Sequence, residues 1–359
     1  MRRAIALALE GWGQTAPNPM VGAVVVAGGE VVGEGYHARY AEAHAEVMAL
    51  RAARARARGA TLYVTLEPCA HHGKTPPCVD AIIEAGVARV VAAVRDPSIA
   101  AGGGAARLRA AGIQVEIGVE REAACELNAP FFYHAAASHR PWVTLKLAIS
   151  ADGAISDPTG EHRWITGPES RREVHRMRAG VDAVAVGIGT VLADDPALTV
   201  RDSPQPRVSP RRVVFDNGLR IPLDSNLVRT ARAVDTRVIA STSGAPSNKI
   251  NALLAAGVRV AMLPTLRDSL GVLQSDGIRS LLVEAGPRIA GSFLAEALVD
   301  RLVIFQSPLV LGEKAPKAFA FAPRNFESSL RDRRIVEQRG FGDDVMTIYA
   351  LQDVPCSPD

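Results

Sequence analysis

The sequence predicts an α/β protein of two domains. Its 359 residues are more than one domain usually contains. Apolar runs of strand length alternate with helix-like stretches along most of the chain, which is the order of a sheet covered by helices on both faces. An alanine-rich connector at residues 135–141 separates two such series. We therefore place a first domain at residues 1–140 and a second at residues 141–359.

The pattern of the first domain predicts its elements in order. Residues 4–10 are typical of a helix. An apolar run at 20–26 is followed by a Gly-Gly turn and a second apolar stretch at 31–32, which indicates a hairpin. Gly59 and Gly86 each follow a helical stretch and suit its C-cap. The remaining expected elements are helix 43–58, strand 61–66, helix 78–85, strand 87–94, helix 105–111, strand 113–119 and helix 122–134.

The second domain repeats the alternation of strands and helices. Residues 168–179 have the pattern of a helix, and residues 202–211, with three prolines, that of a loop. No Gly-x-Gly-x-x-Gly lies in a strand-to-helix turn, so the pattern does not favour a Rossmann nucleotide site. The expected strands are residues 142–149, 183–186, 212–215, 237–241, 258–263, 280–284 and 302–306.

Composition and charge exclude several functional classes. A hydrophobic content of 48% and a charged content of 22% are ordinary for a soluble globular protein. A net charge of +3 is too small to indicate nucleic-acid binding. No long apolar run predicts a membrane span, and the N-terminus lacks the pattern of a signal peptide. Two of the four cysteines belong to the motif described next, which leaves Cys125 and Cys356 unexplained and indicates a reducing cytosol.

One motif carries most of the chemical information. His44 and Glu46 are separated by one residue, and Cys69 and Cys78 follow downstream. An imidazole and two thiolates leave the fourth tetrahedral position of a zinc ion open, as in catalytic sites. Zinc lowers the pKa of a bound water to about 7, and a nearby carboxylate can then transfer protons. His-x-Glu followed by Pro-Cys is typical of zinc-dependent nucleobase deaminases, so we expect Glu46 to be the proton shuttle and the other three residues to be ligands.

The surroundings of this motif are informative too. Eight residues separate the two cysteines, and this insert, residues 70–77, is basic and polar, which suits an anionic substrate such as a sugar phosphate. His44 lies in the first turn of the expected helix 43–58, and Cys78 opens the next helix. The partial positive charge of a helix N-terminus favours thiolate over thiol. The three ligands can therefore converge where two helices begin.

Three alternatives stay open at this point. His71 or His72 could supply a fourth ligand and close the site as a structural zinc centre, although Glu46 would then have no task. A tRNA or nucleoside deaminase with an unrelated second domain predicts a short Cys-x-x-Cys and, for tRNA, a more basic surface. A zinc-stabilised binding module predicts four ligands and a fold that depends on the metal.

The first domain resembles the bifunctional riboflavin-biosynthesis deaminase/reductase family. The resemblance rests on residues 17–22, 33–37, 44–46 and 65–78, and the long insert between the cysteines is itself characteristic of the family. It implies a cytidine-deaminase-like three-layer α/β/α fold that hydrolyses the 2-amino group of a diaminopyrimidinone carrying a ribosylamino 5′-phosphate. The implied substrate contacts are Asn18, His37, His71 and Lys74. Residues 97–104 depart from the family's usual sequence.

The second domain resembles the reductase half of the same family. The matching segments are residues 145–153, 164–166, 187–201 and 283–287. They imply a fold similar to dihydrofolate reductase and an NADPH-dependent reduction of the ribosyl group to a ribityl chain. The resemblance thus covers nearly the whole chain, with the deaminase first and the reductase second.

The expected reductase site combines physical reasoning with this resemblance. Residues 284–292 join a strand end, a glycine turn and a helix start, which presents backbone N–H groups to a phosphate. Lys146 is expected to place its positive charge near the reacting C1′ carbon. The resemblance implies cofactor contacts by Ala148, Trp164, Thr190, Asp194, Asn217, Gly286, Pro287, Arg288, Ile289, Ala290, Gly291 and Ser292. It implies substrate contacts by His162, Leu198, Glu284 and, for the phosphate, Arg178 and Arg201.

Two positions in this site depart from the family's pattern. His162 and Asn217 stand where the family tends to have serine. The expected ligands of the whole chain are zinc, NADPH and a small pyrimidine ribose phosphate, with no nucleic acid and no membrane. We also expect a homo-oligomer in the cytoplasm.

Overall fold

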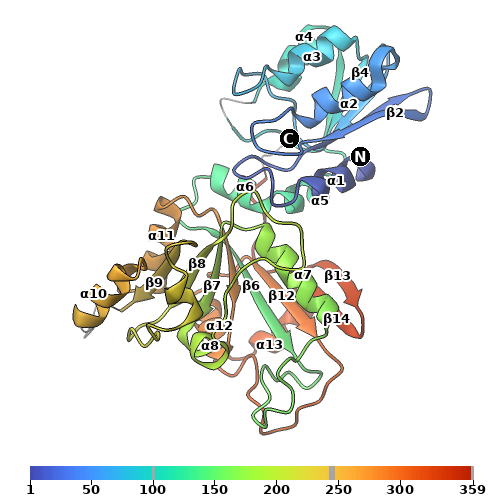
Figure 1. The fold of residues 1–359 in the computed structure, drawn as a ribbon. Helices are drawn as coiled ribbons and strands as arrows, with labels where there is room; N and C mark the ends of the chain where they lie inside the picture. Colours follow the sequence, from blue (N-terminus) through green and yellow to red (C-terminus); the bar gives the residue numbers. More distant parts are fainter. Residues whose placement is uncertain (99–101, 242–246, 357–359) are drawn as a thin grey trace. The chain divides into compact units, whose positions relative to one another are not determined.

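The computed structural model describes residues 1–98, 102–241 and 247–356 (Figure 1). The chain divides into two compact units. One unit is His139–Asp353, and the other is Met1–Ser138 joined by the C-terminal segment that starts at Val354. The sequence analysis assigned this last segment to the second domain, whereas the structure groups it with the first. Each unit contains one sheet with helices packed against it, so the predicted α/β class is confirmed.

The first unit is built on a five-stranded sheet. Its strands are β1 (Gly22–Ala27), β2 (Glu30–Tyr36), β3 (Thr61–Val64), β4 (Arg89–Ala92) and β5 (Gln114–Ile117). Their order is β2-β1-β3-β4-β5. β1 and β2 form the predicted antiparallel hairpin, β1 is antiparallel to β3, and β3, β4 and β5 are parallel. The parallel pairs need crossover connections, which the helices between these strands provide.

Helices cover both faces of this sheet. They are α1 (Arg2–Ala8), α2 (Ala45–Ala53), α3 (Cys78–Ala85), α4 (Gly104–Ala110), α5 (Arg121–Leu127) and α6 (Ala129–Ala135). α2, α3 and α4 share a core with one face of the strands, in which Leu62, Ile82 and Leu108 are fully buried. Gly22 points the other way, toward the backbone of α1. The unit therefore has the predicted three layers.

Two glycines of β2 bring α2 close to the sheet. A side-chain carbon at Gly33 or Gly35 would overlap the backbone of α2 at Ala49, so only glycine permits this approach. The residue that precedes α2 is His44. The close packing of α2 on β2 thus fixes the position of one predicted zinc ligand.

The second unit is built on a nine-stranded sheet of order β10-β9-β8-β7-β11-β6-β12-β14-β13. Seven neighbouring strands, from β10 to β12, are parallel, and β14 and β13 add an antiparallel edge. The strands are β6 (Trp142–Ile149), β7 (Ala183–Gly187), β8 (Arg211–Phe215), β9 (Thr236–Ala240), β10 (Arg259–Met262), β11 (Ser280–Glu284), β12 (Arg301–Gln306), β13 (Ile335–Phe341) and β14 (Asp344–Ala350).

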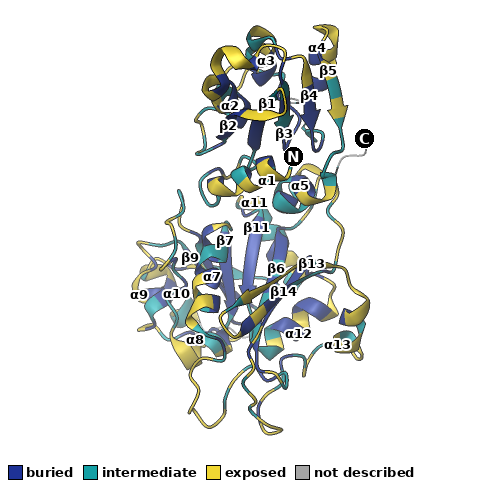
Figure 2. Cartoon of the chain, turned by 90° about the vertical axis from the view of Figure 1, so that its right-hand side faces the viewer, coloured by how far each residue is buried: buried dark blue, intermediate teal, exposed yellow. Residues whose placement is uncertain are grey.

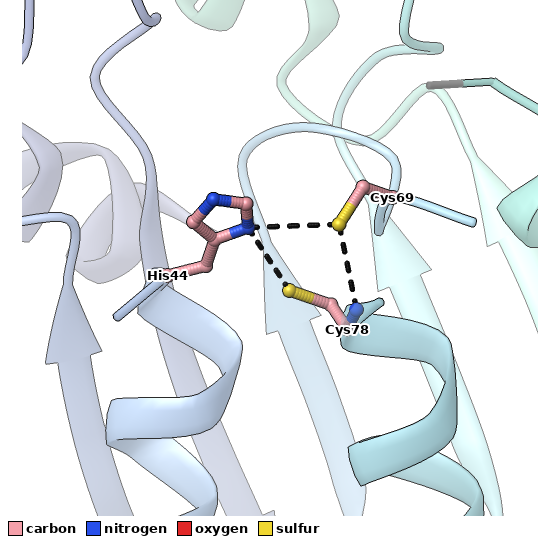
Figure 3. A group of neighbouring side chains, drawn as sticks. All are labelled: His44, Cys69 and Cys78. Atoms are coloured by element: carbon pink, nitrogen blue, oxygen red, sulfur yellow. Dashed lines mark hydrogen bonds between the residues drawn. The ribbon is translucent and has the colours of Figure 1, made fainter. Parts of the chain in front are cut away.

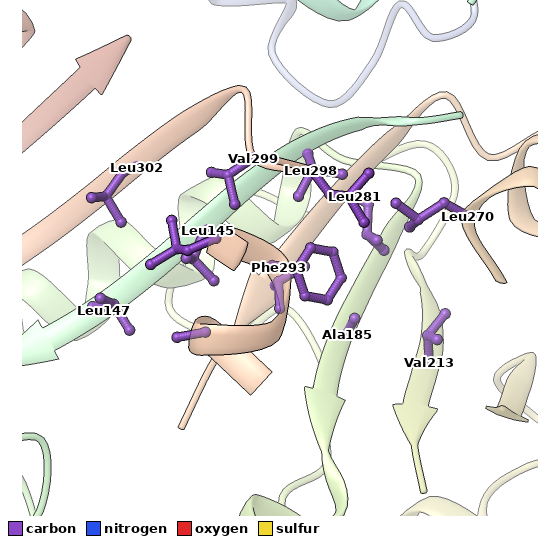
Figure 4. Close-up of a cluster of buried hydrophobic side chains, with 14 of the residues drawn as sticks. Leu145, Leu147, Ala185, Val213, Leu270, Leu281, Phe293, Leu298, Val299 and Leu302 are labelled. Carbon is purple, nitrogen blue, oxygen red and sulfur yellow. The ribbon is translucent and has the colours of Figure 1, made fainter. Parts of the chain in front are cut away.

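Helices also cover both faces of the larger sheet. They are α7 (Pro168–Ala179), α8 (Ile188–Asp194), α9 (Asn226–Arg229), α10 (Ser247–Ala255), α11 (Leu266–Ser275), α12 (Pro287–Ala295) and α13 (Phe326–Ser329). α11 and α12 pack on one face, where Phe293 lies among Leu145, Leu281 and Ala185 (Figure 4). α8, α9 and α10 pack on the other face. The central strands are correspondingly the most buried part of the unit (Figure 2).

Two features of the fold differ from the sequence-based expectation. The predicted helix 122–134 is interrupted at Asn128, whose side-chain amide exchanges two 2.8 Å hydrogen bonds with the backbone of Met20. Pro130, the second residue of α6, has no backbone N–H and therefore cannot continue the hydrogen bonding of the preceding helix. The pair β13 and β14 was not predicted, because β13 is an exposed edge strand without an apolar alternation.

The four cysteines form two different pairs. Cys125 of α5 is disulfide-bonded to Cys356 of the C-terminal segment, which accounts for the two residues that the sequence left unexplained. Cys69 and Cys78 are free and buried. Across the described residues, no helix is both long enough and apolar enough to cross a membrane.

Candidate active sites

The three predicted zinc ligands meet in the first unit (Figure 3). His44 is the N-cap of α2, Cys78 is the first residue of α3, and Cys69 lies in the loop between β3 and α3. Their ligand atoms all lie within 4.8 Å of one another. His44 Nδ1 is 3.2 Å from Cys78 Sγ and 3.6 Å from Cys69 Sγ. Within the described ranges, no other histidine, cysteine or carboxylate joins the cluster.

This donor set fits a zinc ion. Tetrahedral zinc with Zn–S of about 2.3 Å and Zn–N of about 2.0 Å separates its ligand atoms by roughly 3.5 Å. The two measured sulfur–nitrogen distances are of this size. His71, the candidate fourth ligand of a structural site, lies in the lining of the cavity and outside the cluster. The arrangement is thus the three-ligand type, whose remaining position is available to water.

The electrostatics of the cluster suit a cation. The hydrogen bond with Cys78 lowers the pKa of Cys69 to about 4, and the same pairing raises the pKa of Cys78. The hydrogen bond with Cys69 raises the pKa of His44. One thiolate is therefore already favoured without a metal, and a bound dication favours deprotonation of the second thiol.

Glu46 lies beside the cluster without belonging to it. It is in the first turn of α2, is 3% exposed and lines the same cavity as His44. Burial raises its pKa to about 7. A carboxyl group with such a pKa can accept and release a proton near neutrality, which is the property required of a general acid/base.

The cavity around the cluster has a volume of about 320 Å³ and brings together all four predicted substrate contacts of the first unit. The side-chain amide of Asn18 lies 3.4 Å from Nε2 of His37. His37 is 2% exposed, its Nδ1 lies 3.2 Å from the carbonyl oxygen of Ala43, and burial lowers its pKa. His71 lines the wall, and the ammonium of Lys74 stacks 4.4 Å from the ring centre of Tyr40.

Sequence reasoning missed two supporting residues of this site. Thr75 Oγ1 lies 3.4 Å from His44 Nε2, the ring nitrogen that faces away from the thiols. Such a contact orients a metal-bound imidazole. Buried Glu67 accepts a 2.8 Å hydrogen bond from the backbone N–H of Ala105 and one from that of Asp96, and so ties α4 and the loop after β4 to the cavity. Both residues stand in the segment 65–78, so their proximity to the ligands was the available signal.

The second unit contains a larger cavity of about 1320 Å³. It lies at the carboxyl ends of β6, β7, β8 and β11, where ligands bind in open parallel sheets. Most of the predicted reductase residues line it: Lys146, Ala148, Trp164, Arg178, Thr190, Asp194, Arg201, Asn217, Glu284, Gly286, Pro287, Arg288, Ile289 and Ser292.

The structure does not bring four predicted residues to this lining. Leu198 is 2% exposed and belongs to the hydrophobic core beneath α8. Ala290 is buried, and a side-chain carbon at Gly291 would overlap the backbone of Phe321, so both face protein instead of the cavity. His162 is exposed, and its backbone N–H donates to Asp157 Oδ2 at 2.9 Å.

A helix start faces the cavity as predicted. α12 begins at Pro287 with Gly286 as its N-cap, and no side chain caps its first turn. The N-terminus of a helix carries free N–H groups and partial positive charge, which favours a phosphate. The lining by Gly286, Ile289 and Ser292 indicates that this end is accessible from the cavity.

Three charged groups form the polar centre of the cavity. Arg178 of α7 donates two hydrogen bonds from its fork to the Glu284 carboxylate, one of them 2.9 Å from Nη2 to Oε2, and a third from Nη1 to the Thr199 carbonyl oxygen at 2.9 Å. Burial alone would raise the pKa of Glu284, but the charge and hydrogen bonds of Arg178 outweigh it and lower this pKa. Burial lowers the pKa of Lys146, which adjoins both groups.

Fold and sites together define the chain as a zinc-dependent deaminase joined to a second α/β domain with a nucleotide-sized cavity. Family models support both halves. The cytidine and deoxycytidylate deaminase zinc-binding region matches residues 1–94, and the RibD C-terminal domain matches residues 141–341.

Relatives match almost the entire chain. The riboflavin biosynthesis protein RibD of Aquifex aeolicus is 43% identical over 352 residues, 97% of each chain, and that of Escherichia coli is 44% identical over 334 residues, 88% of each. A solved structure from Thermotoga maritima, described as a diaminohydroxyphosphoribosylaminopyrimidine deaminase/5-amino-6-(5-phosphoribosylamino)uracil reductase, has a TM-score of 0.81 and 35% identity, covering 98% of this chain and 97% of its own.

The chain therefore belongs to the RibD family, the bifunctional deaminase/reductase enzymes of riboflavin biosynthesis. It uses zinc in its deaminase domain and NADPH in its reductase domain. The fold class, the two activities and both cofactors predicted from the sequence are confirmed.

Proposed function

We propose that the first unit deaminates 2,5-diamino-6-ribosylamino-4(3H)-pyrimidinone 5′-phosphate and that the second reduces the ribosyl group of the product to a ribityl chain. The observation that carries this proposal is the three-ligand cluster beside Glu46 in a cavity of about 320 Å³, a size that admits a pyrimidine with part of its sugar. The activity named for the Thermotoga maritima relative, which matches both units, supports the same pair of reactions.

In the deaminase, His44, Cys69 and Cys78 would hold the zinc ion. When bound, zinc lowers the pKa of water and so makes hydroxide available at neutral pH. Glu46 takes a proton from the attacking water and delivers it to the departing amino group, so that water is consumed and ammonia is released. Asn18 can donate to and accept from the heterocycle edge at once, and buried His37 beside it limits how the ring can lie.

The basic insert between the cysteines serves the substrate's sugar phosphate. His71 lines the cavity, and Lys74 is exposed at its rim, where the contact with Tyr40 orients its ammonium group. Lys74 in particular supplies positive charge at this rim. We assign phosphate binding to this rim and heterocycle binding to the buried end near Asn18.

In the reductase, the start of α12 would hold the NADPH pyrophosphate, with Ala148, Trp164, Thr190, Asp194 and Asn217 lining the rest of the cofactor. NADPH supplies the hydride for reduction at C1′. Lys146 stabilises the negative charge that develops at the reacting end of the sugar and can donate the balancing proton. Glu284, held by Arg178, orients the sugar hydroxyls, and Arg201 contributes to phosphate binding.

The direct test uses the purified full-length protein with the diamino substrate. The proposal requires release of ammonia followed by oxidation of one NADPH for each ammonia released. Ammonia without NADPH oxidation would leave the deaminase assignment standing and remove the reductase assignment. NADPH oxidation that does not depend on prior deamination would contradict the proposed order.

We also propose a cytoplasmic location, a small-molecule substrate instead of a nucleic acid, and a homo-oligomeric state. The small net charge of +3 supports a small substrate. β13 is an exposed edge of the nine-stranded sheet, a kind of surface that pairing with another chain protects. Light scattering at several protein concentrations tests the oligomeric state, and a strictly monomeric mass would refute it.

A further inference from the structure

His175 is an additional polar residue in the wall of the reductase cavity. It lies on α7, one helical turn before Arg178, and is 9% exposed. Its Nδ1 atom is turned toward the backbone of the segment after Leu198, at 3.1 Å from the Thr199 carbonyl oxygen and 3.1 Å from the Arg201 nitrogen. With Nδ1 occupied in this way, Nε2 is the ring nitrogen left for a ligand in the cavity.

The hydrogen bonds assign the ring proton to Nε2. The backbone N–H of Arg201 is an obligatory donor, and within the described part of the chain its acceptor is Nδ1 of His175. The Thr199 carbonyl oxygen, by contrast, already accepts a 2.9 Å hydrogen bond from Arg178 Nη1 and does not depend on His175. A proton on Nδ1 would leave the Arg201 N–H facing another N–H. Neutral His175 therefore accepts at Nδ1 and carries an N–H donor at Nε2.

The groups around this donor favour an anion. Arg178 and Arg201 flank His175, and Glu284 is neutralised by its paired hydrogen bonds with Arg178. Across the described residues, the Arg201 guanidinium has no hydrogen-bond or ion-pair partner, although it lines the cavity. Burial, together with the charges of Arg178 and Arg201, lowers the pKa of His175, which favours the neutral ring.

We propose that His175 donates a hydrogen bond from Nε2–H to the phosphate of the reductase substrate, beside Arg201. This assignment rests on the proposed function, since it requires a phosphorylated substrate in the cavity. A neutral N–H donor beside the guanidinium groups adds one more directed hydrogen bond to the phosphate, so its loss is expected in substrate affinity.

Two substitutions separate this role from a structural one. Asparagine at position 175 can place an amide group where Nδ1 lies and keep the Arg201 N–H bonded, but it removes Nε2. Glutamine reaches the position of Nε2 and gives up Nδ1. If the phosphate contact matters, His175→Asn weakens substrate binding and His175→Gln retains part of it. If His175 only supports the 199–201 backbone, the order is reversed.

The experiment uses the full-length protein and the deaminated substrate. Calorimetry without NADPH gives the substrate Kd, and steady-state reduction at saturating NADPH gives kcat and KM. For His175→Asn we expect Kd and KM to rise by about 10-fold, as for loss of a hydrogen bond to a charged group, with kcat and the NADPH Kd unchanged. With the dephosphorylated substrate, the variant and the wild type should bind equally.

Two results would overturn the proposal. An unchanged Kd in His175→Asn would show that His175 makes no contact with the phosphate. An equal loss of affinity for the dephosphorylated substrate would show that His175 contacts a sugar hydroxyl instead. A normal NADPH Kd and an unchanged melting temperature verify that the variant is folded. If wild-type protein binds or reduces no phosphorylated substrate at all, the proposed function fails first, and that outcome is separate from any effect of His175.

Discussion

The two catalytic cavities are built in different ways. In the deaminase, the zinc ligands and the acid lie between residues 44 and 78, and three ligand atoms within 4.8 Å of one another define the chemistry. In the reductase, the lining comes from four strand ends and the helices after them, over residues 146–292, around about 1320 Å³. A metal site needs few atoms at fixed spacing. A cavity for a dinucleotide uses backbone and surface from many segments, so no single motif identifies it.

The largest expected effect is on the deaminase. Glu46→Gln keeps the shape of the side chain but removes the group that transfers protons, so ammonia release should fall by about 10²–10⁴-fold. Zinc content, measured by atomic absorption, should stay at one ion per chain. Reduction of the already deaminated substrate serves as the internal control and should be unchanged. Full deaminase activity in this variant would contradict the role of Glu46.

The matching change in the reductase is Lys146→Met. It replaces a half-buried ammonium group beside Glu284 and Arg178 with an apolar chain of similar length. We expect kcat for NADPH oxidation to fall by about 10²-fold, because the charge that stabilises the reacting sugar is lost. Ammonia release should be unaffected. If ammonia release fell together with NADPH oxidation, the substitution in the reductase cavity would also affect the deaminase cavity, and the two could not be treated as independent.

A substitution at Leu198 tests whether this residue belongs to the hydrophobic core or contacts the substrate. Truncation of a buried leucine costs about 2–5 kcal/mol, so Leu198→Ala should lower the free energy of unfolding of the second unit by that amount. Urea unfolding followed by fluorescence measures it. Leu223→Ala, at a leucine that is 45% exposed and outside the cavity, is the matched control and should change little. A stable Leu198→Ala protein with a raised substrate KM would instead support the contact implied by the family.

The smallest predicted effect is a pH dependence of stability. The folded-state pKa of Glu284 is lowered, so its pairing with Arg178 stabilises the second unit above about pH 4.3, the usual glutamate pKa, and this contribution is lost as the pH falls through the folded value. The free energy of unfolding of the wild type should therefore fall more steeply than that of Glu284→Gln between pH 6 and pH 3, as followed by urea unfolding at each pH. Glu169→Gln, an exposed change on α7, is the control for the loss of one carboxylate.

The same contrast explains what the sequence could predict. Helix α3 and strands β6 and β11 have the predicted bounds, because their patterns end at clear signals such as Gly86. The zinc cluster was predictable from residue types and spacing. In the reductase, the set of cofactor residues came from family resemblance, and position within a motif does not reveal which way a side chain points. Leu198 and Gly291 both stand in matching segments, yet they face the interior.

Other features of the fold and the sites could not be predicted from the local sequence. The break between α5 and α6 depends on hydrogen bonds from Asn128 to Met20, which is 108 residues away. β13 pairs only with β14 and has no apolar face of its own. His175 is a single histidine on a helix. Its only hint was the three-residue spacing to Arg178, which places both on one helical face.

The Cys125–Cys356 bond has a topological consequence for how the enzyme can be dissected. Because Val354 and Cys356 pack with Phe131 and Phe132, the deaminase is a discontinuous unit and the reductase is, in effect, an insertion into it. Phe131 also lines the deaminase cavity. A fragment cut after residue 138 would uncover this aromatic cluster, whereas circular permutation that fuses the tail to the N-terminus would preserve it. Gene fission between the two activities therefore requires more than one break in the chain.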